Sequence, residues 1–534
     1  MHLKRLLNPW PDAPLPLWMI FPVIFAALFI THFKLLRLPY YWDEAGYYIP
    51  AAWDFYRTGS LIPISTVSNA HPPLPSIYLA LWWKTSGFLP LVTREAVLLV
   101  AALGLLGVWR LAMRLTDVAS VAFWTALLTG LYPVWFAQSV LAHADIFATA
   151  CGIWGMVYAL PQHGRRPAVA AAWFAAAALC KETAIVLPLT LMLINFVEGW
   201  LHHTSARRHI WREAVWMCTS VLPLIGWYLY HHAMTGYFFG NPEFLRYNAE
   251  STLEPVRILA AFGHRVLHLT VHMNMFVPVF MGLAALLLEP RPDPDGHERA
   301  SIAPFSTARI LALLLANALF FSFLGGALLT RYLLPMYPLV LLLALTAMYR
   351  RVPYWQALAI LSAGAFLAGL FVNPPYGFAP EDNLAYASVI RMDMNGIAQL
   401  KRRYPDAVVL TAWPMSDYLT KPELGYVKKP WDVIRLEDFT AQQIHIAAQE
   451  PQKYSAALVF STKYTPPPSL FSIVSQNEEA LNERYFGQHH DLAPAQIATQ
   501  LNGTLIWREE RQGMWVALLR FNRQVEARSQ APER

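Results

Sequence analysis

The sequence has little charge and little cysteine for its length. Only 14% of its 534 residues are charged and 56% are hydrophobic, whereas soluble domains carry roughly 25% charged residues. This balance excludes an ordinary soluble globular protein. The three cysteines, Cys151, Cys180 and Cys218, all lie in apolar runs, where a thiol behaves as a small buried hydrophobe. They predict neither a disulfide framework nor a zinc site.

No run of basic residues is interleaved with aromatic residues, so the net charge of +6 does not indicate nucleic-acid binding. An internal repeat is also lacking. What the chain does have is 20 Trp and 24 Tyr, the residues that gather in belts at membrane interfaces. The composition therefore predicts a membrane protein.

A membrane span needs about 20 apolar residues. Eleven segments approach or reach that length, and they predict a mainly α, polytopic membrane protein with about eleven transmembrane helices. The segments are residues 17–33, 96–113, 120–136, 146–160, 168–179, 184–196, 214–230, 266–288, 310–328, 333–348 and 354–372. The fourth to sixth are short, so this count is open by one or two.

Basic residues in short loops mark the cytoplasmic side of a membrane protein. With the N-terminus inside, the inside loops hold Lys4, Arg5, Arg110, Arg114, Arg165, Arg166, Arg207, Arg208, Arg212, Arg291, Arg299, Arg309, Arg350 and Arg351. The loops 34–95 and 233–263 and everything after residue 372 are then outside. No small-residue cleavage site follows Lys4 and Arg5, which predicts an uncleaved anchor in the inner (plasma) membrane.

Residues 373–534 differ in character from residues 1–372. They hold 17 basic and 18 acidic residues and no phosphate-binding glycine loop. We expect helices over 385–403 and 440–448, strands over 408–412, 456–461, 504–507 and 515–520, and a hairpin around Gly513. This predicts an extracytoplasmic (in a bacterium, periplasmic) α/β domain without a catalytic group of its own, which docks the acceptor or caps the site.

Asp43 and Glu44 stand side by side where the first long loop begins. Carboxylates at a membrane boundary are costly, so this pair indicates chemistry or an ion. Asp43 is the candidate general base, and Glu44 shares that task, holds a cation or orients Asp43. The structural alternative is an acidic start to a helix over 45–56. A divalent cation at the pair stays open, although two carboxylates are few ligands, and nothing indicates an organic cofactor.

Other charged residues interrupt apolar runs on the same predicted outer face. Asp145 lies in a very short turn, Lys181 and Glu182 split an apolar stretch, and Arg331 and Tyr332 open the tenth span. Lys181 and Arg331 are candidate phosphate ligands. The structural alternatives are a helix cap for Asp145, a self-compensated turn for Lys181 with Glu182, and a snorkelling helix end for Arg331.

Acidic and cationic groups together on one face of an apolar bundle suit a lipid-phosphate donor. Its apolar tail would lie against the bundle while cations hold its phosphate and a carboxylate activates the acceptor. In the second long loop and at its end, Arg246, Tyr247 and Arg265 are further, weaker candidates for binding this substrate.

The run from Tyr40 to Gly59, with Trp42-Asp43-Glu44-Ala45 in it and His71-Pro72-Pro73-Leu74 after it, resembles a known family. It is similar to the first outer loop of the membrane-embedded, lipid-carrier-dependent glycosyltransferases of the C superfamily (GT-C). Residues 15–372 are similar to the branch with protein O-mannosyltransferases and lipid A aminoarabinose transferases. Asp145, Lys181-Glu182 and the run from Arg331 to Pro335 match family positions in type and order.

The resemblance implies an inverting hexosyl- or pentosyltransferase that uses a polyprenyl-phosphate-linked sugar on the outer face of the bilayer. Its acceptor would be a protein, a glycolipid or a polysaccharide. Asp43, Glu44 and Asp145 would then be catalytic, Lys181, Arg331 and His71 would bind the donor phosphate, and Glu182, Tyr332 and Arg246 would bind substrate. His71 stands where the aminoarabinose transferases have a lysine that faces the donor phosphate. This departure favours a general glycosyltransferase.

Two other functions fit parts of the sequence. A transporter or flippase of a lipid-linked sugar would place polar groups near the bilayer midplane and often carries repeats. A membrane anchor that presents the tail as a binding module would leave the acidic loop without a purpose.

Overall fold

The computed structural model describes residues 16–201, 207–242, 245–246, 252–293, 296–466, 481–486 and 490–521. Lys4, Arg5 and Tyr247 lie outside the described residues. The chain divides into two compact units. The first, called here the helical unit, is Met1–Leu36 with Pro50–Val372; the second, the tail unit, is Arg37–Ile49 with Asn373–Arg534.

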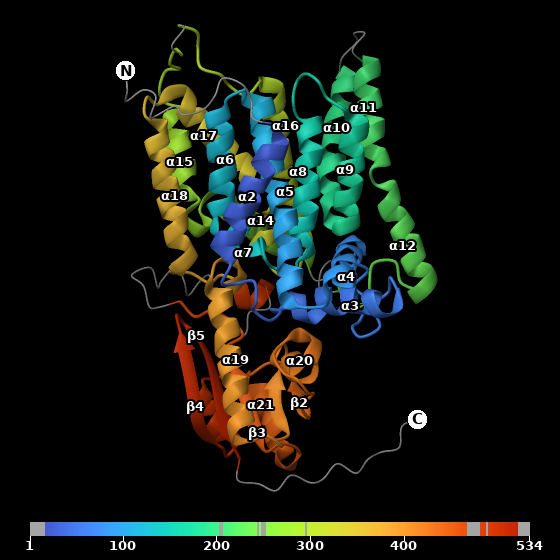
Figure 1. The fold of residues 1–534 in the computed structure, drawn as a ribbon, viewed down its shortest axis with the longest axis vertical. Helices are drawn as coiled ribbons and strands as arrows, with labels where there is room; N and C mark the ends of the chain where they lie inside the picture. Colours follow the sequence, from blue (N-terminus) through green and yellow to red (C-terminus); the bar gives the residue numbers. More distant parts are fainter. Residues whose placement is uncertain are drawn as a thin grey trace. The chain divides into compact units, whose positions relative to one another are not determined.

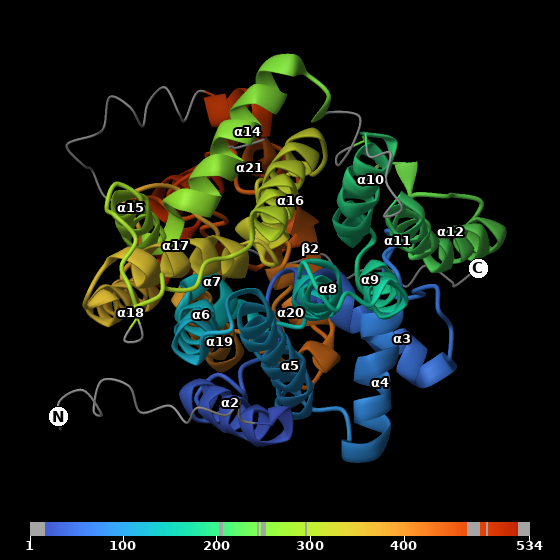
Figure 2. The same cartoon turned by 90° about the horizontal axis from the view of Figure 1, so that it is seen from above.

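The helical unit is a bundle whose long helices run side by side in Figure 1 and are seen end-on in Figure 2. Its helices are α2 (Leu17–His32), α3 (Ile49–Thr58), α4 (Leu74–Ser86), α5 (Pro90–Thr116), α6 (Ala119–Leu131), α7 (Pro133–Gln138), α8 (Ala144–Ala159), α9 (Pro167–Cys180), α10 (Val186–Leu201), α11 (Arg207–Thr219), α12 (Leu222–Thr235), α14 (Pro255–Thr270), α15 (Phe276–Ala285), α16 (Pro304–Phe323), α17 (Tyr337–Arg351) and α18 (Trp355–Phe371). Helix α4 lies across the direction of the bundle (Figures 1 and 2).

Within the described residues, three helical segments are long and apolar enough to cross a membrane: Pro90–Thr116, Glu182–Leu201 and Pro304–Phe323. Five further apolar helices are shorter, among them α8 and α9. Large apolar side chains such as Phe280, Leu259 and Trp200 remain exposed on the helices, as expected of a surface that faces lipid. The chain is thus a mainly helical membrane protein, and the number of eleven spans stays a prediction.

Two of the predicted spans are interrupted. Residues 214–230 form α11 and α12 instead of one helix, because Pro223 in the first turn of α12 lacks the N–H that a continuing helix needs. Residues 266–288 belong to α14 and α15, which meet at an angle of 101°. Met273 and Asn274 between them have φ angles of 49° and 67°, and this left-handed backbone ends the helix.

Helices α8 and α9 form a tight antiparallel pair. A Cβ atom on Gly155 of α8 would lie 2.5 Å from the Phe174 ring of α9, so only glycine allows this approach. The first turn of α8 and the last residue of α9 therefore come to the same end of the pair. That end carries the charged residues described below.

The tail unit contains a five-stranded mixed sheet in the order β2-β1-β3-β5-β4. Its strands and helices are α19 (Ala385–Arg403), β1 (Val409–Ala412), α20 (Met415–Thr420), β2 (Val433–Leu436), α21 (Ala441–Gln449), β3 (Ala456–Phe460), α23 (Pro494–Gln500), β4 (Thr504–Arg511) and β5 (Met514–Arg520). Strand β1 is parallel to β2 and β3, and β5 is antiparallel to β3 and β4. Helix α19 packs against β3, β4 and β5.

The predicted hairpin is present, with Gln512 and Gly513 as its two turn residues at φ angles of 49° and 80°. Two positive φ angles in a two-residue turn match the right-handed twist of the strands. Strand β2 was not predicted, because only one of its four residues is buried and it lacks a clear apolar alternation.

Candidate active site

The predicted site residues are distributed over both units. Asp43 and Glu44 belong to the tail unit, whereas His71, Asp145, Lys181, Glu182, Arg246, Arg331 and Tyr332 belong to the helical unit.

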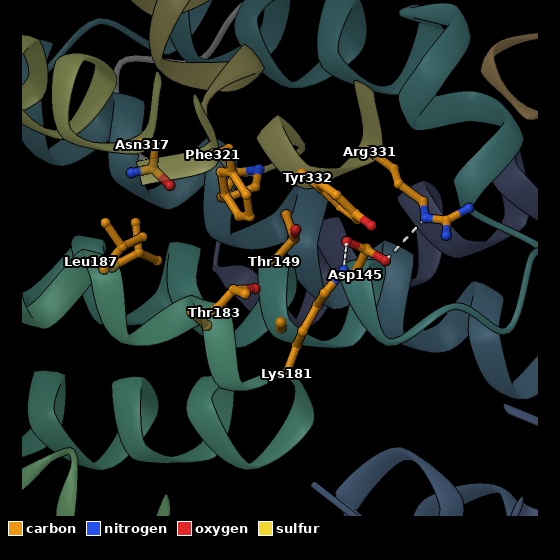
Figure 3. Close-up of a pocket in the computed structure, with 13 residues that line it drawn as sticks. Asp145, Thr149, Lys181, Thr183, Leu187, Asn317, Phe321, Arg331 and Tyr332 are labelled. Atoms are coloured by element: carbon orange, nitrogen blue, oxygen red, sulfur yellow. Dashed lines mark hydrogen bonds and ion pairs between the residues drawn. The ribbon is translucent and has the colours of Figure 1, made fainter. Parts of the chain in front are cut away.

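In the helical unit, one carboxylate holds two cations (Figure 3). Asp145 lies in the first turn of α8, Lys181 follows the end of α9, and Arg331 belongs to the short helix Thr330–Leu333. The Lys181 Nζ atom lies 2.6 Å from Asp145 Oδ1, and Arg331 Nε lies 3.3 Å from Asp145 Oδ2 as an ion pair outside hydrogen-bond geometry. All three side chains are at most 8% exposed. Two cations against one anion leave a positive excess in an apolar setting.

Tyr332 lies among these cations. Lys181 Nζ is 4.2 Å from the centre of its ring, and the guanidinium carbons of Arg331 and Arg265 are 5.9 and 5.7 Å away. The aromatic face attracts each of them through its quadrupole. A narrow cavity of about 30 Å³ opens beside the group, lined also by Thr149, Thr183, Asn317 and Phe321 (Figure 3).

The structure moves Arg265 from the end of a predicted loop into helix α14, where its side chain is fully buried. Its Nε donates to the carbonyl of Phe321 at 3.2 Å and its Nη1 to the carbonyl of Leu329 at 2.8 Å. Its Nη2 has no hydrogen-bond partner within the described residues. The apolar pattern predicts a span that begins one residue after Arg265, at residue 266, and so leaves Arg265 outside a helix.

Lys181 and Glu182 do not compensate each other's charge in a local turn. Lys181 pairs with Asp145, whereas Glu182 Oε2 lies 3.0 Å from Nδ1 of His71. The pair with His71 joins the residue before Pro72-Pro73 to the end of α9. Arg246 is exposed, and no contact among the described residues connects it with this group.

In the tail unit, the two carboxylates of the acidic pair differ in burial. Glu44 is fully buried, and its Oε2 accepts the backbone N–H of Tyr41 at 2.9 Å. Asp43 is only partly buried and makes no capping hydrogen bond to the helical segment that begins after it. A helix does begin at the pair, as the structural alternative had it, and the Glu44 carboxylate bonds to the backbone just before it.

The backbone around the pair is unusual. Trp42 has a φ angle of 47°, a left-handed conformation that bulky residues rarely adopt. Residues Glu44–Tyr48 form a π-helix before α3, and such turns are frequent at functional sites. Within the described residues, no group of three or more metal-binding side chains comes together, and a cation at Asp43 and Glu44 stays an untested expectation.

No protein-family model and no curated protein sequence matches the chain. Among solved structures, the chain is similar to ArnT from Cupriavidus metallidurans, in the apo state and bound to undecaprenyl phosphate. Sequence identity is 14% and the TM-score 0.51 in both comparisons, which cover 93% and 94% of this chain and 97% of ArnT. The chain therefore shares its fold with ArnT, which at the level of the fold confirms the resemblance to GT-C glycosyltransferases.

Proposed function

We propose that this chain is an inverting glycosyltransferase that moves a sugar from a polyprenyl-phosphate carrier to an acceptor on the outer face of the membrane. The observation that carries the proposal is the pair of buried cations, Lys181 and Arg331, held by Asp145 in an apolar bundle. Charged groups inside such a bundle are costly and mark a substrate site. The ArnT structure with bound undecaprenyl phosphate supports a lipid phosphate as the substrate.

The cations act on the leaving group. As the bond between the anomeric carbon and the phosphate oxygen breaks, negative charge grows on the phosphate, and fixed cations in a dry site stabilise it. Asp145 keeps Lys181 and Arg331 in place before the donor arrives, and their positive excess remains for the phosphate. Arg265 and the Tyr332 hydroxyl extend this group, and His71, oriented by Glu182, adds a further donor.

Asp43 acts on the acceptor. Its carboxylate takes the proton of the acceptor hydroxyl as the oxygen attacks the anomeric carbon from the side opposite the phosphate. One such displacement inverts the configuration of that carbon. Glu44 is the orienting member of the pair, because its carboxylate already accepts the Tyr41 N–H.

The sugar is a hexose or a pentose, and the acceptor a protein, a glycolipid or a polysaccharide. The enzyme would lie in the inner membrane with both groups of site residues extracytoplasmic. A transporter is the less supported alternative, because Asp145 and Lys181 lie at helix ends and not along the middle of a span.

The test is a deletion strain whose glycans and glycolipids are compared with wild type by mass spectrometry. A product that disappears on deletion and returns with the wild-type chain supports the proposal. Lys181→Met should restore it about 100- to 1,000-fold less efficiently, the usual loss for one donor that stabilises transition-state charge. Lys84→Met, at an exposed lysine of α4, is the matched control and should restore it fully. An unchanged set of glycans in the deletion strain would refute the proposal.

A further inference from the structure

The segment that carries Asp43 is built into the tail unit, although it is more than 300 residues away in the sequence. The N–H of Tyr40 donates to the carbonyl of Leu424 at 3.3 Å, and the N–H of Trp42 donates to the hydroxyl oxygen of Tyr418 at 3.1 Å. Tyr418 lies on helix α20. Two backbone N–H groups of the segment thus donate hydrogen bonds to residues after Asn373.

Aromatic contacts support the same attachment. The Tyr41 ring lies 6.0 Å from the ring of Tyr386 on α19, and the Trp42 ring meets the Trp413 ring edge-to-face at 5.0 Å. A Cβ atom on Gly46 would lie 2.8 Å from Cζ2 of the Trp413 ring. Trp413 therefore touches the chain on both sides of Asp43 and Glu44.

These contacts fall where the backbone needs support. The left-handed Trp42 is followed at once by Asp43 and then by the π-helix. Such a conformation persists only where surrounding groups over-determine it. The Tyr418 hydroxyl accepts the Trp42 N–H and the Glu44 carboxylate accepts the Tyr41 N–H, and both hydrogen bonds help to hold the turn.

Tyr418 is itself fixed in the interior of the tail unit. Its side chain is fully buried and its ring stacks on Tyr426 at 4.0 Å. Burial, reinforced by the neighbouring Asp393 carboxyl, raises the pKa of Tyr418 well above its ordinary value, so the hydroxyl stays neutral. A rigid, neutral hydroxyl is suited to receive a backbone N–H at a fixed place.

We propose that Tyr418 is a positioning residue for glycosyl transfer. Its hydroxyl accepts the Trp42 N–H and so fixes the backbone conformation that directs Asp43 toward the acceptor, and Trp413 is the second support. The inference rests on the proposed function, in which Asp43 is the base. It gives the tail unit a part in the chemistry in addition to docking or capping. In this proposal Asp43 is the group of the tail unit that meets the acceptor, and Tyr418 and Trp413 act through the segment Arg37–Ile49 that carries it.

The test compares Tyr418→Phe with Tyr454→Phe in the full chain. Both substitutions delete one buried hydroxyl that hydrogen-bonds to the backbone, since Tyr454 donates to the carbonyl of Ala447 at 3.0 Å. The Tyr454 ring packs edge-to-face on Phe521, which follows β5. Initial rates of product formation are measured in the complemented deletion strain. Binding of undecaprenyl phosphate and thermal unfolding are measured on the purified proteins.

We expect Tyr418→Phe to lower the initial rate about 10- to 100-fold, because a misplacement of about 1 Å has an effect of this size. Undecaprenyl phosphate binding and the unfolding temperature should match those of Tyr454→Phe, which keeps its rate. Gly46→Ala, which pushes on Trp413 from the other side of the contact, should lower the rate in the same way. Equal rates for the two tyrosine variants, or losses that follow the unfolding temperature in both, would overturn the inference.

A double variant separates this inference from the function it rests on. If Tyr418 acts through Asp43, then Asp43→Asn combined with Tyr418→Phe should be no slower than Asp43→Asn alone, because coupled residues are not additive. Multiplied losses would overturn the positioning role. A fully active Asp43→Asn variant would instead remove the proposed base, a failure of the proposed function that is seen without any change at Tyr418.

Discussion

At the scale of single residues, the adjacent carboxylates Asp43 and Glu44 have different surroundings. Glu44 is buried against a backbone N–H, whereas Asp43 remains partly exposed and does not cap the helix. The sequence indicated the pair, but it did not indicate which of the two carboxylates is buried and which is partly exposed. The orientation of each side chain depends on the left-handed turn at Trp42, which no local pattern of residues indicates.

Asp43→Asn should lower transfer about 10²- to 10⁴-fold, the usual contribution of a general base. Glu44→Gln should keep most of the activity, because its amide oxygen still accepts the Tyr41 N–H. Initial rates in the complemented deletion strain measure both, with membrane insertion checked by the amount of protein in the membrane fraction. A larger loss for Glu44→Gln than for Asp43→Asn would reverse the two roles.

The second prediction at this scale concerns Arg331. Arg331→Lys keeps the charge beside Asp145 but loses the planar fork of the guanidinium. It should therefore bind undecaprenyl phosphate more weakly than wild type and more tightly than Arg331→Ala, with about a tenfold step between the two variants, or 1.4 kcal/mol. Equal, wild-type affinities would reduce Arg331 to a helix-end residue that only neutralises Asp145.

At the scale of elements, sequence reasoning placed most helices correctly and failed at breaks that depend on distant contacts. The hairpin at Gly513 follows a local rule and was predicted. Helix α5 begins at Pro90, inside the predicted loop 34–95, although proline at a first helical position is also a local signal. The bend between α14 and α15 follows no local rule, because Asn274 is held by a hydrogen bond from its Nδ2 to the carbonyl of Ala365 on α18 at 2.7 Å. The same limit hid Tyr418 and Trp413, whose partners lie over 300 residues away.

Helix α19 carries a carboxyl group that should make stability depend on pH. Asp393 is buried, and burial raises its pKa well above the ordinary value. Its contribution to stability is complete below the pKa of the unfolded chain and is lost as the pH rises toward the raised pKa of the folded chain. Tyr41 and Tyr418 beside it have raised pKa values and stay neutral over this range.

Asp393→Asn removes the ionisation at nearly constant shape. The unfolding temperature of the variant should therefore rise relative to that of wild type as the pH increases from 5 to 8. For a unit of this size, each 1 kcal/mol of stability that wild type loses corresponds to about 2–4 °C. Thermal unfolding of the full chain in detergent at several pH values measures it. A difference between the two proteins that does not change with pH would show that Asp393 titrates normally.

At the scale of the whole molecule, the short-loop charges predict the N-terminus inside and residues after 372 outside. Reporter fusions at residue 380 should be active with a reporter that works only after export and inactive with one that works only in the cytoplasm. A fusion after Arg166, in the turn between α8 and α9, is the opposite control. A cytoplasmic signal at residue 380 would contradict the orientation and the outer-face reaction with it.

The division into two units predicts what a truncation does. The residues proposed to hold the donor phosphate all belong to the helical unit, whereas Asp43 lies in the segment Arg37–Ile49 that belongs to the tail unit. A chain that stops at Val372, before Asn373-Pro374-Pro375, keeps the first group and removes the residues that hold the second. We expect it to insert, to bind undecaprenyl phosphate within a fewfold of the full chain, and to transfer poorly.

Binding and product formation are to be measured on the same truncated preparation, with Tyr418→Phe in the full chain as the reference for losing one support alone. The truncated chain should be at least as slow as this variant, because it also loses Leu424, Tyr386 and Trp413 from around the segment. Lost binding in a folded truncation would place part of the donor site on the tail. Undiminished transfer would mean that the acidic segment needs no support from the tail, which would contradict both the positioning role of Tyr418 and a role of the tail in the reaction.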